Sequence, residues 1–444
     1  MIDYGSIAYD SAADSQLQSV QAIQNKALAI CSGSMKGTPV AALQVECGEM
    51  PLRLRRLAQQ IKFAIKVTNA KNHAATQIFA EHWTLQFGRY QPNRRPLANK
   101  VAEFFGCTPE MANIRGPEWP SLPPWTTRLP AVDIGLTTEV RKSEAPDILA
   151  SLTREKINSY ADRVHVYTDA SKLAGGEVGI GCLIMNSGNL QALQKSLRIT
   201  DNVTVYTGEL MAIKLAFESI LQATNERSPR SFAIFSDSLS VIEAFRHGRC
   251  RSRPNLFNEV IDLMAATAID VVLVWVPSHI GISGNETADK LAVGGANRNA
   301  VDVNVGIELD EAYLLADRFV MAKWQNSWSN EKTGSHYRKL EPLVGNVKQL
   351  KLRPRQAETT VARLRLGRCH LNAYLQQMGA HADGLCDCCA VRETIDHFLI
   401  ECPNGPRKEV KEICERHNIS FDLATVLSDE IVLRKIASTI KRKL

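Results

Sequence analysis

Four acidic residues in the middle of this 444-residue chain occupy comparable places in the predicted secondary structure. Asp169 ends the strand-like stretch VHVYTDA, and Asp237 ends the strand-like stretch SFAIFSD. Glu209 lies in the first turn of a predicted helix, and Asp289 lies in the last helix of the same region. Because strand ends and the starts of crossover helices meet at one edge of such a sheet, the four carboxylates could converge there.

Clustered carboxylates repel one another unless they are protonated or bound to cations, and an all-oxygen set suits Mg²⁺ or Mn²⁺. Two such ions about 4 Å apart can activate a water and stabilise the leaving oxygen of a phosphodiester. Each acid alone has a structural alternative. Asp169 could cap a turn, Asp237 could N-cap the next helix, and Glu209 could serve a helix dipole. The ordered set of four favours the metal-binding interpretation.

The elements that must position these acids follow from hydrophobic periodicity after Tyr160. The pattern predicts strand, strand, strand, helix, strand, helix, helix, strand and helix. The strands are VHVYTDA, VGIGCLIMN, ALQKSLRI, SFAIFSD and VVLVWVPSH, and the helices include TGELMAIKLAFESILQAT and NETADKLAVGGAN. A meander followed by crossovers predicts an α/β domain with a mixed sheet and helices on its faces.

The flanking regions differ from the central region in their periodicity and proline content. Residues 14–80 are predicted to be helical, with Pro51 at a first helical position. Residues 91–160 are rich in proline and are predicted to be a linker. Residues 308–340 are predicted to be helical, with Trp324 and Trp328 spaced i,i+4, and a small basic region with cysteines and histidines follows.

The segments YTDAS, TGELMAI, FSDS and WVPSHIGISGNETADKLA resemble, in order and spacing, the four motifs of type 1 ribonuclease H. They are most similar to the ribonuclease H domain of LINE-like (non-LTR) retrotransposon polyproteins, over about residues 162–298. The resemblance implies a ribonuclease H-like mixed five-stranded sheet. It also implies endonucleolytic cleavage of the RNA strand of RNA/DNA hybrids, with two Mg²⁺ (or Mn²⁺) ions bound by Asp169, Glu209, Asp237 and Asp289.

The resemblance extends to three further residues. His279 falls on the family's mobile histidine, which assists proton transfer or product release, and a loop imidazole titrates near neutrality. Ser171 and Asn285 are candidate contacts to the hybrid backbone, which is recognised by its shape. Only RHGRCRSRPN separates the two middle helices, so the basic protrusion of bacterial relatives is missing and the grip on the hybrid is expected from elsewhere.

Four of the eleven cysteines fall within residues 386–402. Cys386, Cys389, His397 and Cys402 have the spacing C-x2-C-x7-H-x4-C, which suits a closed, structural zinc site. Cys388 could substitute for a neighbour or be a bystander thiol. The alternative is a set of reduced cysteines packed in a core.

Both ends of the chain resemble the same polyproteins. GRCHLNAYLQQMG before the cysteines, with Cys402–Pro403, is similar to their C-terminal region, whose zinc knuckles are associated with nucleic-acid binding. VQAIQNKALAICSG and TPVAALQVECGEMPLRLRRL are similar to the segment between reverse transcriptase and ribonuclease H. The chain has no adjacent Asp-Asp pair of the kind found in a polymerase active site, so we expect no DNA synthesis. We also expect the chain to be the C-terminal part of a longer element protein.

These patterns predict four regions. Residues 1–90 are a helical remnant of the connection to the reverse transcriptase, and residues 91–160 are a Pro-rich linker. Residues 161–298 are the ribonuclease H domain, and residues 308–444 are a basic helical region with a zinc knuckle at 386–402.

Charge is distributed unevenly along the chain, whose net charge is +6. Residues 334–370 hold nine Lys and Arg residues and two acidic residues. Residues 51–71 hold six Lys and Arg residues and no acidic residue. The basic flanks could bind a polyanion on both sides of the central domain. Alternatively, they are the solvated faces of helices. The expected partners are an RNA/DNA hybrid and other retrotransposon proteins.

The start of the chain lacks the features of a signal peptide, and no stretch has the roughly 18 apolar residues that span a bilayer. We therefore expect an intracellular protein of the cytoplasm or nucleus with no membrane partner.

Two other functions are compatible with parts of the sequence. A catalytically silent, nucleic-acid-binding remnant of a transposon protein would keep the fold and the basic flanks, but it has no need of four crowded acids. A transposase or integrase on the same fold would carry its acids on different elements, which the separate WVPSH…D motif disfavours.

Overall fold

The computed structural model describes residues 3–70, 97–108, 114–115, 129–139, 146–187, 190–223, 231–265, 269–346 and 352–440. These residues form two compact units. The helical unit holds residues 3–64, 97–106 and 316–440, and the α/β unit holds residues 65–70 and the described part of 107–315. The N-terminal and C-terminal regions that the sequence separates thus belong to one unit.

The α/β unit is built on a six-stranded mixed sheet with the strand order β2-β7-β6-β3-β4-β5. The strands are β2 (Ala131–Asp133), β3 (Val164–Lys172), β4 (Val178–Ile184), β5 (Leu193–Ile199), β6 (Ser231–Ser236) and β7 (Asp270–Trp275). β3, β4 and β5 pair antiparallel, while β3 with β6, β6 with β7 and β7 with β2 pair parallel. The expected mixed sheet is confirmed: β3 to β7 are the five expected strands, and β2, which lies outside residues 161–298, adds a sixth.

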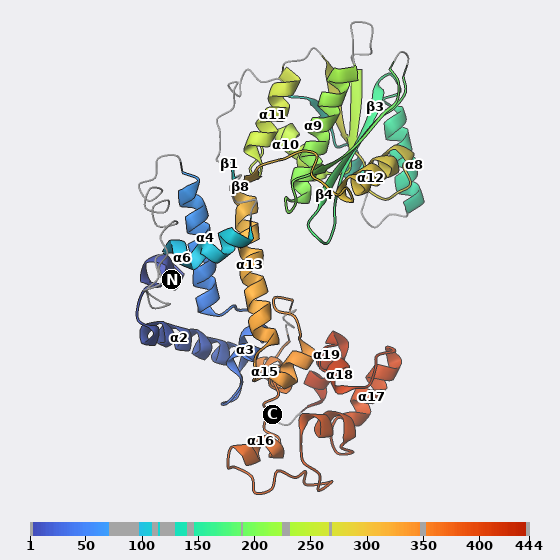
Figure 1. The fold of residues 1–444 in the computed structure, drawn as a ribbon. Helices are drawn as coiled ribbons and strands as arrows, with labels where there is room; N and C mark the ends of the chain where they lie inside the picture. Colours follow the sequence, from blue (N-terminus) through green and yellow to red (C-terminus); the bar gives the residue numbers. More distant parts are fainter. Residues whose placement is uncertain are drawn as a thin grey trace. The chain divides into compact units, whose positions relative to one another are not determined.

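Helices cover both faces of the sheet. They are α8 (Pro146–Asn158), α9 (Val205–Ala223), α10 (Leu239–His247), α11 (Pro254–Ala265) and α12 (Ser283–Ala296). Figure 1 shows α9, α10 and α11 on one side of the sheet and α8 and α12 on the other. From β3 to α12 the order of strands and helices is the one that the periodicity predicts.

The core beneath α12 and α8 is formed by alternate residues of the central strands. Tyr167 and Phe235 stack with ring centroids 5.0 Å apart, and Val274 and Ala288 are fully buried in the same cluster. Alternation of this kind follows from the two-residue period of a strand, which sends the intervening side chains to the opposite face.

Two glycines let α12 lie directly on β4. A Cβ atom at Gly179 would be 2.1 Å from the carbonyl oxygen of Ala292, and one at Gly181 would be 2.3 Å from that of Ala288. Glycine is therefore required at both positions for the helix to approach the strand backbone. This contact fixes the position of Asp289, the residue after Ala288 on α12.

The helical unit joins segments from both ends of the chain. Its N-terminal helices include α2 (Asp14–Ser32), α3 (Val40–Glu46) and α4 (Leu52–Thr68), of which α4 begins in this unit. Its later helices include α13 (Leu309–Ser329), which begins in the α/β unit, α14 (Ser335–Leu340), α15 (Arg355–Arg365), α16 (Asn372–Gln377), α17 (Arg407–Arg416), α18 (Leu423–Val426) and α19 (Glu430–Thr439). None of the described helices is both long and apolar enough to cross a membrane.

Buried Arg365 holds these segments together. Its guanidinium donates to Glu46 of α3 at 3.2 Å, to Glu341 at 2.6 Å and to the carbonyl oxygen of Leu427 at 2.5 Å. A buried cation with several charge-assisted hydrogen bonds is well satisfied, whereas removal of one partner is strongly destabilising.

Two expectations about the flanks were wrong. The segment predicted to be a linker contains β2, α8 and α6 (Leu97–Cys107). The apolar side of α6 is buried, with Phe104 packed against Phe319 at a centroid distance of 5.4 Å. The helix predicted over 308–340 is divided into α13 and α14, because Gly334 adopts φ 72 at the start of α14. Trp324 and Trp328 are both buried on α13.

Candidate active site

Strand register places Asp169 beside Asp237. β3 and β6 are in parallel register through the pair Tyr167 and Phe235, and each aspartate follows its member of that pair by two residues. The sequence suggests that Asp169 ends its strand, but the structure differs. Asp169 lies within β3, which continues to pair with β4 as far as Lys172.

Glu209 reaches the same place from the second turn of α9, not from the first turn as the sequence suggests. Gly208 allows the close approach, because a Cβ atom there would be 2.8 Å from the Cβ atom of Ala170. The backbone N–H of Ala170 donates to Asp169 Oδ1 at 2.7 Å and to Glu209 Oε1 at 3.2 Å. One oxygen each of Asp169, Glu209 and Asp237 lies within 4.8 Å of the others.

The environment makes negative charge at this cluster unfavourable. Burial and the charges of Asp237 and Asp289 raise the pKa of Asp169 to about 7. Burial and the charges of Asp169 and Asp237 raise the pKa of Glu209 well above its usual value, and burial also raises the pKa of Asp237. Glu209 Oε2 is buried and has no hydrogen-bond partner among the described residues. An unsatisfied carboxylate oxygen among three converging acids fits the donor set of a hard divalent cation.

Asp289 and His279 lie at the edge of this cluster. Asp289 is half-buried in the second turn of α12 and is not one of the three closest acids, but its charge raises the pKa of both Asp169 and Asp237. His279 is exposed and adopts φ 55, and its positive charge opposes the effect of burial on the pKa of Asp237.

The two predicted substrate contacts differ in exposure. Ser171 is half-buried on β3, two residues beyond Asp169 and therefore on the same face of the strand. Asn285 is 4 % exposed in the first turn of α12, and its Oδ1 is buried without a hydrogen-bond partner among the described residues.

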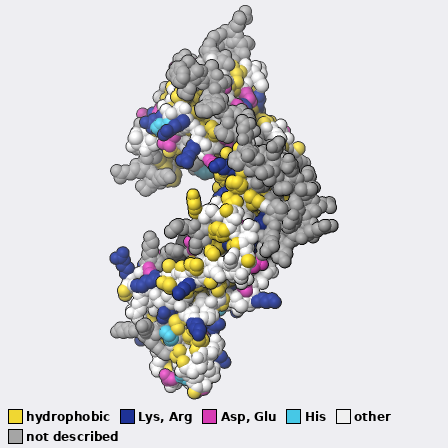
Figure 2. All heavy atoms as spheres, turned by 90° about the vertical axis from the view of Figure 1, so that its left-hand side faces the viewer, with side chains coloured by type: hydrophobic (Ala, Val, Ile, Leu, Met, Phe, Trp, Pro, Cys, Tyr) yellow, Lys and Arg dark blue, Asp and Glu magenta, His cyan; other side chains and the backbone are white. Residues whose placement is uncertain are grey.

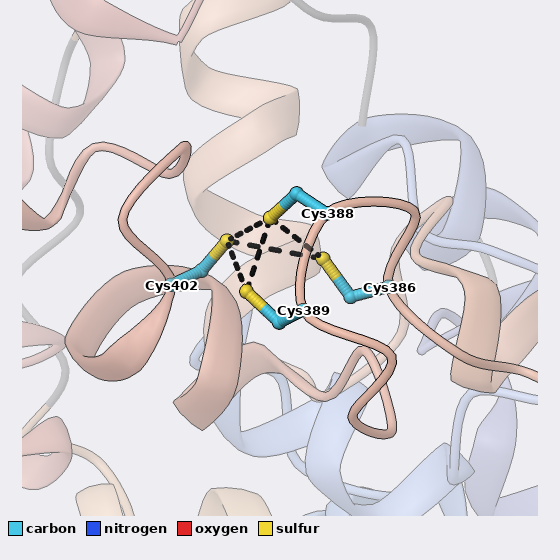
Figure 3. A group of neighbouring side chains, drawn as sticks. All are labelled: Cys386, Cys388, Cys389 and Cys402. Atoms are coloured by element: carbon cyan, nitrogen blue, oxygen red, sulfur yellow. Dashed lines mark hydrogen bonds between the residues drawn. The ribbon is translucent and has the colours of Figure 1, made fainter.

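Four cysteines of the helical unit form a second cluster, in which the sulfur atoms of Cys386, Cys388, Cys389 and Cys402 point toward one another (Figure 3). Cys402 Sγ is 3.8 Å from Cys386 Sγ and 3.8 Å from Cys389 Sγ. Cys388 Sγ is 3.0 Å from Cys389 Sγ and 3.3 Å from Cys402 Sγ. Tetrahedral zinc with Zn–S bonds of about 2.3 Å separates its sulfurs by roughly 3.8 Å, so the four thiols fit such an ion with small adjustments.

The membership of this cluster differs from the set that the spacing suggests. Cys386, Cys389 and Cys402 come together as predicted, but the fourth member is Cys388 and not His397. His397 is buried in η3 (His397–Glu401), with Nδ1 3.2 Å from Glu401 Oε2, and its ring interacts with the thiol of Cys386, so it borders the cluster. The sequence does not indicate which of the adjacent Cys388 and Cys389 turns inward. In the structure both do, in a loop where Ala390 adopts φ 53.

Part of the basic block at 334–370 has a structural role. Arg338 and Arg363 donate to backbone carbonyls within the helical unit, and Arg365 is buried. Tyr337 and Tyr374 are also buried, so their rings cannot stack on bases at the surface. On the face drawn in Figure 2, the Lys and Arg side chains of the described residues are dispersed among other groups.

Residues 161–297 match the RNase H family model. This stretch runs from just before β3 to the end of α12 and contains all four carboxylates. The segment 161–297 is therefore an RNase H domain within a longer chain.

Two curated relatives illustrate the likeness. The Ribonuclease H of Rippkaea orientalis (strain PCC 8801 / RF-1) is 24% identical over 173 residues, which are 34% of this chain and 99% of the relative. The Ribonuclease H of Trichodesmium erythraeum (strain IMS101) is 24% identical over 161 residues, which are 33% of this chain and 96% of the relative.

Solved structures of ribonucleases H are also similar to part of the chain. LC11-RNase H1, crystallised in complex with an RNA/DNA hybrid, is 18% identical and covers 30% of this chain and 97% of its own, with a TM-score of 0.27. RNase H1 from the halophilic archaeon Halobacterium salinarum NRC-1 is 22% identical and covers 30% of this chain and 96% of its own, with a TM-score of 0.25.

Proposed function

We propose that this protein is a metal-dependent endonuclease that cleaves the RNA strand of RNA/DNA hybrids. The observation that carries the proposal is the convergence of Asp169, Glu209 and Asp237, with a buried Glu209 oxygen that has no protein partner among the described residues. Crowded, desolvated carboxylates are unfavourable in a fold kept only to bind a polyanion, but they suit a cation site. The match of residues 161–297 to the RNase H family supports the same activity.

The roles of the residues follow from their positions. Asp169, Glu209 and Asp237 would bind Mg²⁺ or Mn²⁺, and Asp289 would complete the set from α12. Two bound divalent ions would supply the charge that activates a water and stabilises the leaving oxygen of the phosphodiester. Exposed His279 would move a proton at this edge of the site, since an imidazole can both accept and donate one. Ser171 would contact the hybrid backbone, while buried Asn285 would do so only after a local rearrangement.

The test is cleavage of a labelled RNA/DNA hybrid by the full chain in Mg²⁺. We expect metal-dependent cutting of the RNA strand that EDTA abolishes, with single-stranded and duplex RNA left intact. Because loss of a residue that merely orients a metal ligand already reduces activity by roughly 10- to 100-fold, Asp169→Asn should reduce cleavage more than about 100-fold. Glu243→Gln, at an exposed position on α10, is the matched control and should cleave like the wild type.

The second candidate is a catalytically silent, nucleic-acid-binding remnant. It would bind the hybrid equally well as wild type and as Asp169→Asn, and neither protein would cut in Mg²⁺ or Mn²⁺. That result would reject the enzyme and leave the binding function.

The context of the domain is a separate proposal. The motifs and the flanking segments support an origin in a LINE-like retrotransposon polyprotein. The four converging thiols support a structural Zn²⁺ site in the helical unit. Retrotransposon proteins as partners remain a prediction from the same resemblance.

A further inference from the structure

A buried carboxylate from outside the segment 161–297 caps the helix that carries Glu209. Glu311 of α13 is 3 % exposed, and its Oε1 accepts hydrogen bonds from the backbone N–H of Thr204 at 2.9 Å and from Thr207 Oγ1 at 2.5 Å. Thr204 precedes α9, and its Oγ1 accepts from the backbone N–H of Thr207 at 3.2 Å. The start of α9 is thus fixed by its own N-cap and by the Glu311 carboxylate.

The other oxygen of Glu311 is held by a buried arginine. Arg253 lies in the turn before α11, is 1 % exposed, and donates to Glu311 Oε2 at 2.7 Å and to the carbonyl oxygen of Gly306 at 2.8 Å. The pair therefore connects three segments of the α/β unit: the start of α9, the turn between α10 and α11, and the start of α13. A buried Glu without this partner would be an uncompensated charge.

The chain between α12 and α13 follows a defined path to reach this network. The backbone N–H groups of Asp302 and Val303 both donate to the carbonyl oxygen of Arg198, at 2.8 and 3.1 Å. The N–H of Val305 donates to Thr200 Oγ1 at 2.7 Å. Residues 302–305 therefore extend along the end of β5, and this path places Glu311 at the start of α9.

We infer that Glu311, held by Arg253, is a positioning residue for Glu209, so that the active site of this chain requires residues beyond the segment 161–297. The inference rests on the proposed function. Glu209 is two residues after Thr207 on α9, and the hydrogen bond of Glu209 to Ala170 is long at 3.2 Å, so its position depends on the first turn of the helix. A negative charge at this end also favours the helix dipole. Without it, the first turn can fray and the carboxylate leaves the cation site.

The inference is tested in the full chain with Glu311→Ala and Thr207→Val. The first removes the carboxylate, and the second removes only the hydroxyl donor while Glu311 keeps Arg253. Glu259→Gln is the matched control, since Glu259 of α11 pairs with Lys214 in the middle of α9 at 2.6 Å. For each protein, hybrid cleavage is measured against Mg²⁺ concentration and against hybrid concentration, with the folded fraction taken from thermal unfolding.

For Glu311→Ala we expect the Mg²⁺ concentration for half-maximal activity to rise roughly tenfold or more, with kcat reduced and KM for the hybrid nearly unchanged. Thr207→Val should show a smaller change in the same direction, and Glu259→Gln should match the wild type. A Mg²⁺ dependence in Thr207→Val and Glu311→Ala equal to that of Glu259→Gln, after correction for folded fraction, would overturn the inference. If Glu311→Ala does not fold, Thr207→Val alone decides.

A binding measurement separates this inference from the proposed function. Mn²⁺ binding to each full-length variant is followed by calorimetry, which needs no turnover. If the wild type binds Mn²⁺ but does not cut hybrid, the proposed function fails, and a weaker Mn²⁺ affinity in Thr207→Val still supports the positioning role. If the wild type cuts hybrid and all variants bind Mn²⁺ equally, only the positioning role fails.

Discussion

Asp169 lies 7 % exposed beside two other carboxylates, and its pKa of about 7 compares with roughly 3.9 for an aspartate in an unfolded chain. At pH values between these two pKa values, Asp169 is protonated more in the folded protein than in the unfolded protein. The free energy of unfolding therefore falls as the pH rises through this window, which is the reverse of the behaviour of a salt-bridged aspartate. Glu209, whose pKa is also raised, contributes in the same direction.

We predict that the metal-free protein loses stability between about pH 4 and pH 7, by an amount on the order of a few kcal/mol. In EDTA above pH 7, Asp169→Asn should melt at a higher temperature than the wild type, because the amide removes a buried charge. The measurement is Tm against pH in EDTA, with Glu243→Gln as the control that should follow the wild type. Saturating Mg²⁺ should raise the Tm of the wild type more than that of Asp169→Asn, and an equal rise in both would contradict a cation site at Asp169.

The four candidate active-site acids could be predicted from the sequence because each lies in a local motif on an element with clear periodicity. Their supports could not be found in this way. Glu311 lies 104 residues from Thr207 in the chain, and its stretch LDEAYLLADRF resembles any amphipathic helix. β2 has only three residues in a Pro-rich stretch and pairs only with β7, so it shows no alternation. Long-range pairing determined both features, and the sequence carries no local signal of it.

At the scale of elements, the contact between β4 and α12 is decided by glycine. We predict that Gly181→Ala destabilises the α/β unit by roughly 1–3 kcal/mol, because the added methyl would meet the Ala288 carbonyl oxygen at 2.3 Å and neither backbone can easily yield. Displacement of α12 should also weaken hybrid cleavage, since it carries Asp289. Thermal unfolding and the hybrid assay check both effects.

The control places the same methyl group elsewhere on α12, at a position that faces β5. At Gly294 the nearest atom is Ser196 Oγ at 3.6 Å, an ordinary contact, so Gly294→Ala should fold and cleave like the wild type. Equal stability of the two variants would show that α12 can move away from β4 without penalty.

At the scale of the whole molecule, the two units should respond to different metals. We predict two calorimetric transitions, of which Mg²⁺ raises one and a zinc-selective chelator lowers the other, because the carboxylates lie in the α/β unit and the thiols in the helical unit. Cys388→Ser should lose zinc, whereas His397→Ala should retain it if the four thiols are the ligands. The exposed Cys31→Ser is the control. Retention of zinc by Cys388→Ser together with its loss from His397→Ala would restore the ligand set that the spacing suggests.

The helical unit is interrupted in the chain by the entire α/β unit, and Glu46 meets Arg365 across 319 residues. A ribosome adding roughly 5–20 residues per second needs about 15–60 s to make that distance. During translation the α/β unit can therefore be complete before the later helices that pack with α3 have been made. Until then, the apolar side chains of α3 remain exposed to solvent. We therefore expect the nascent N-terminal helices to depend on chaperones until the C-terminal helices have been made.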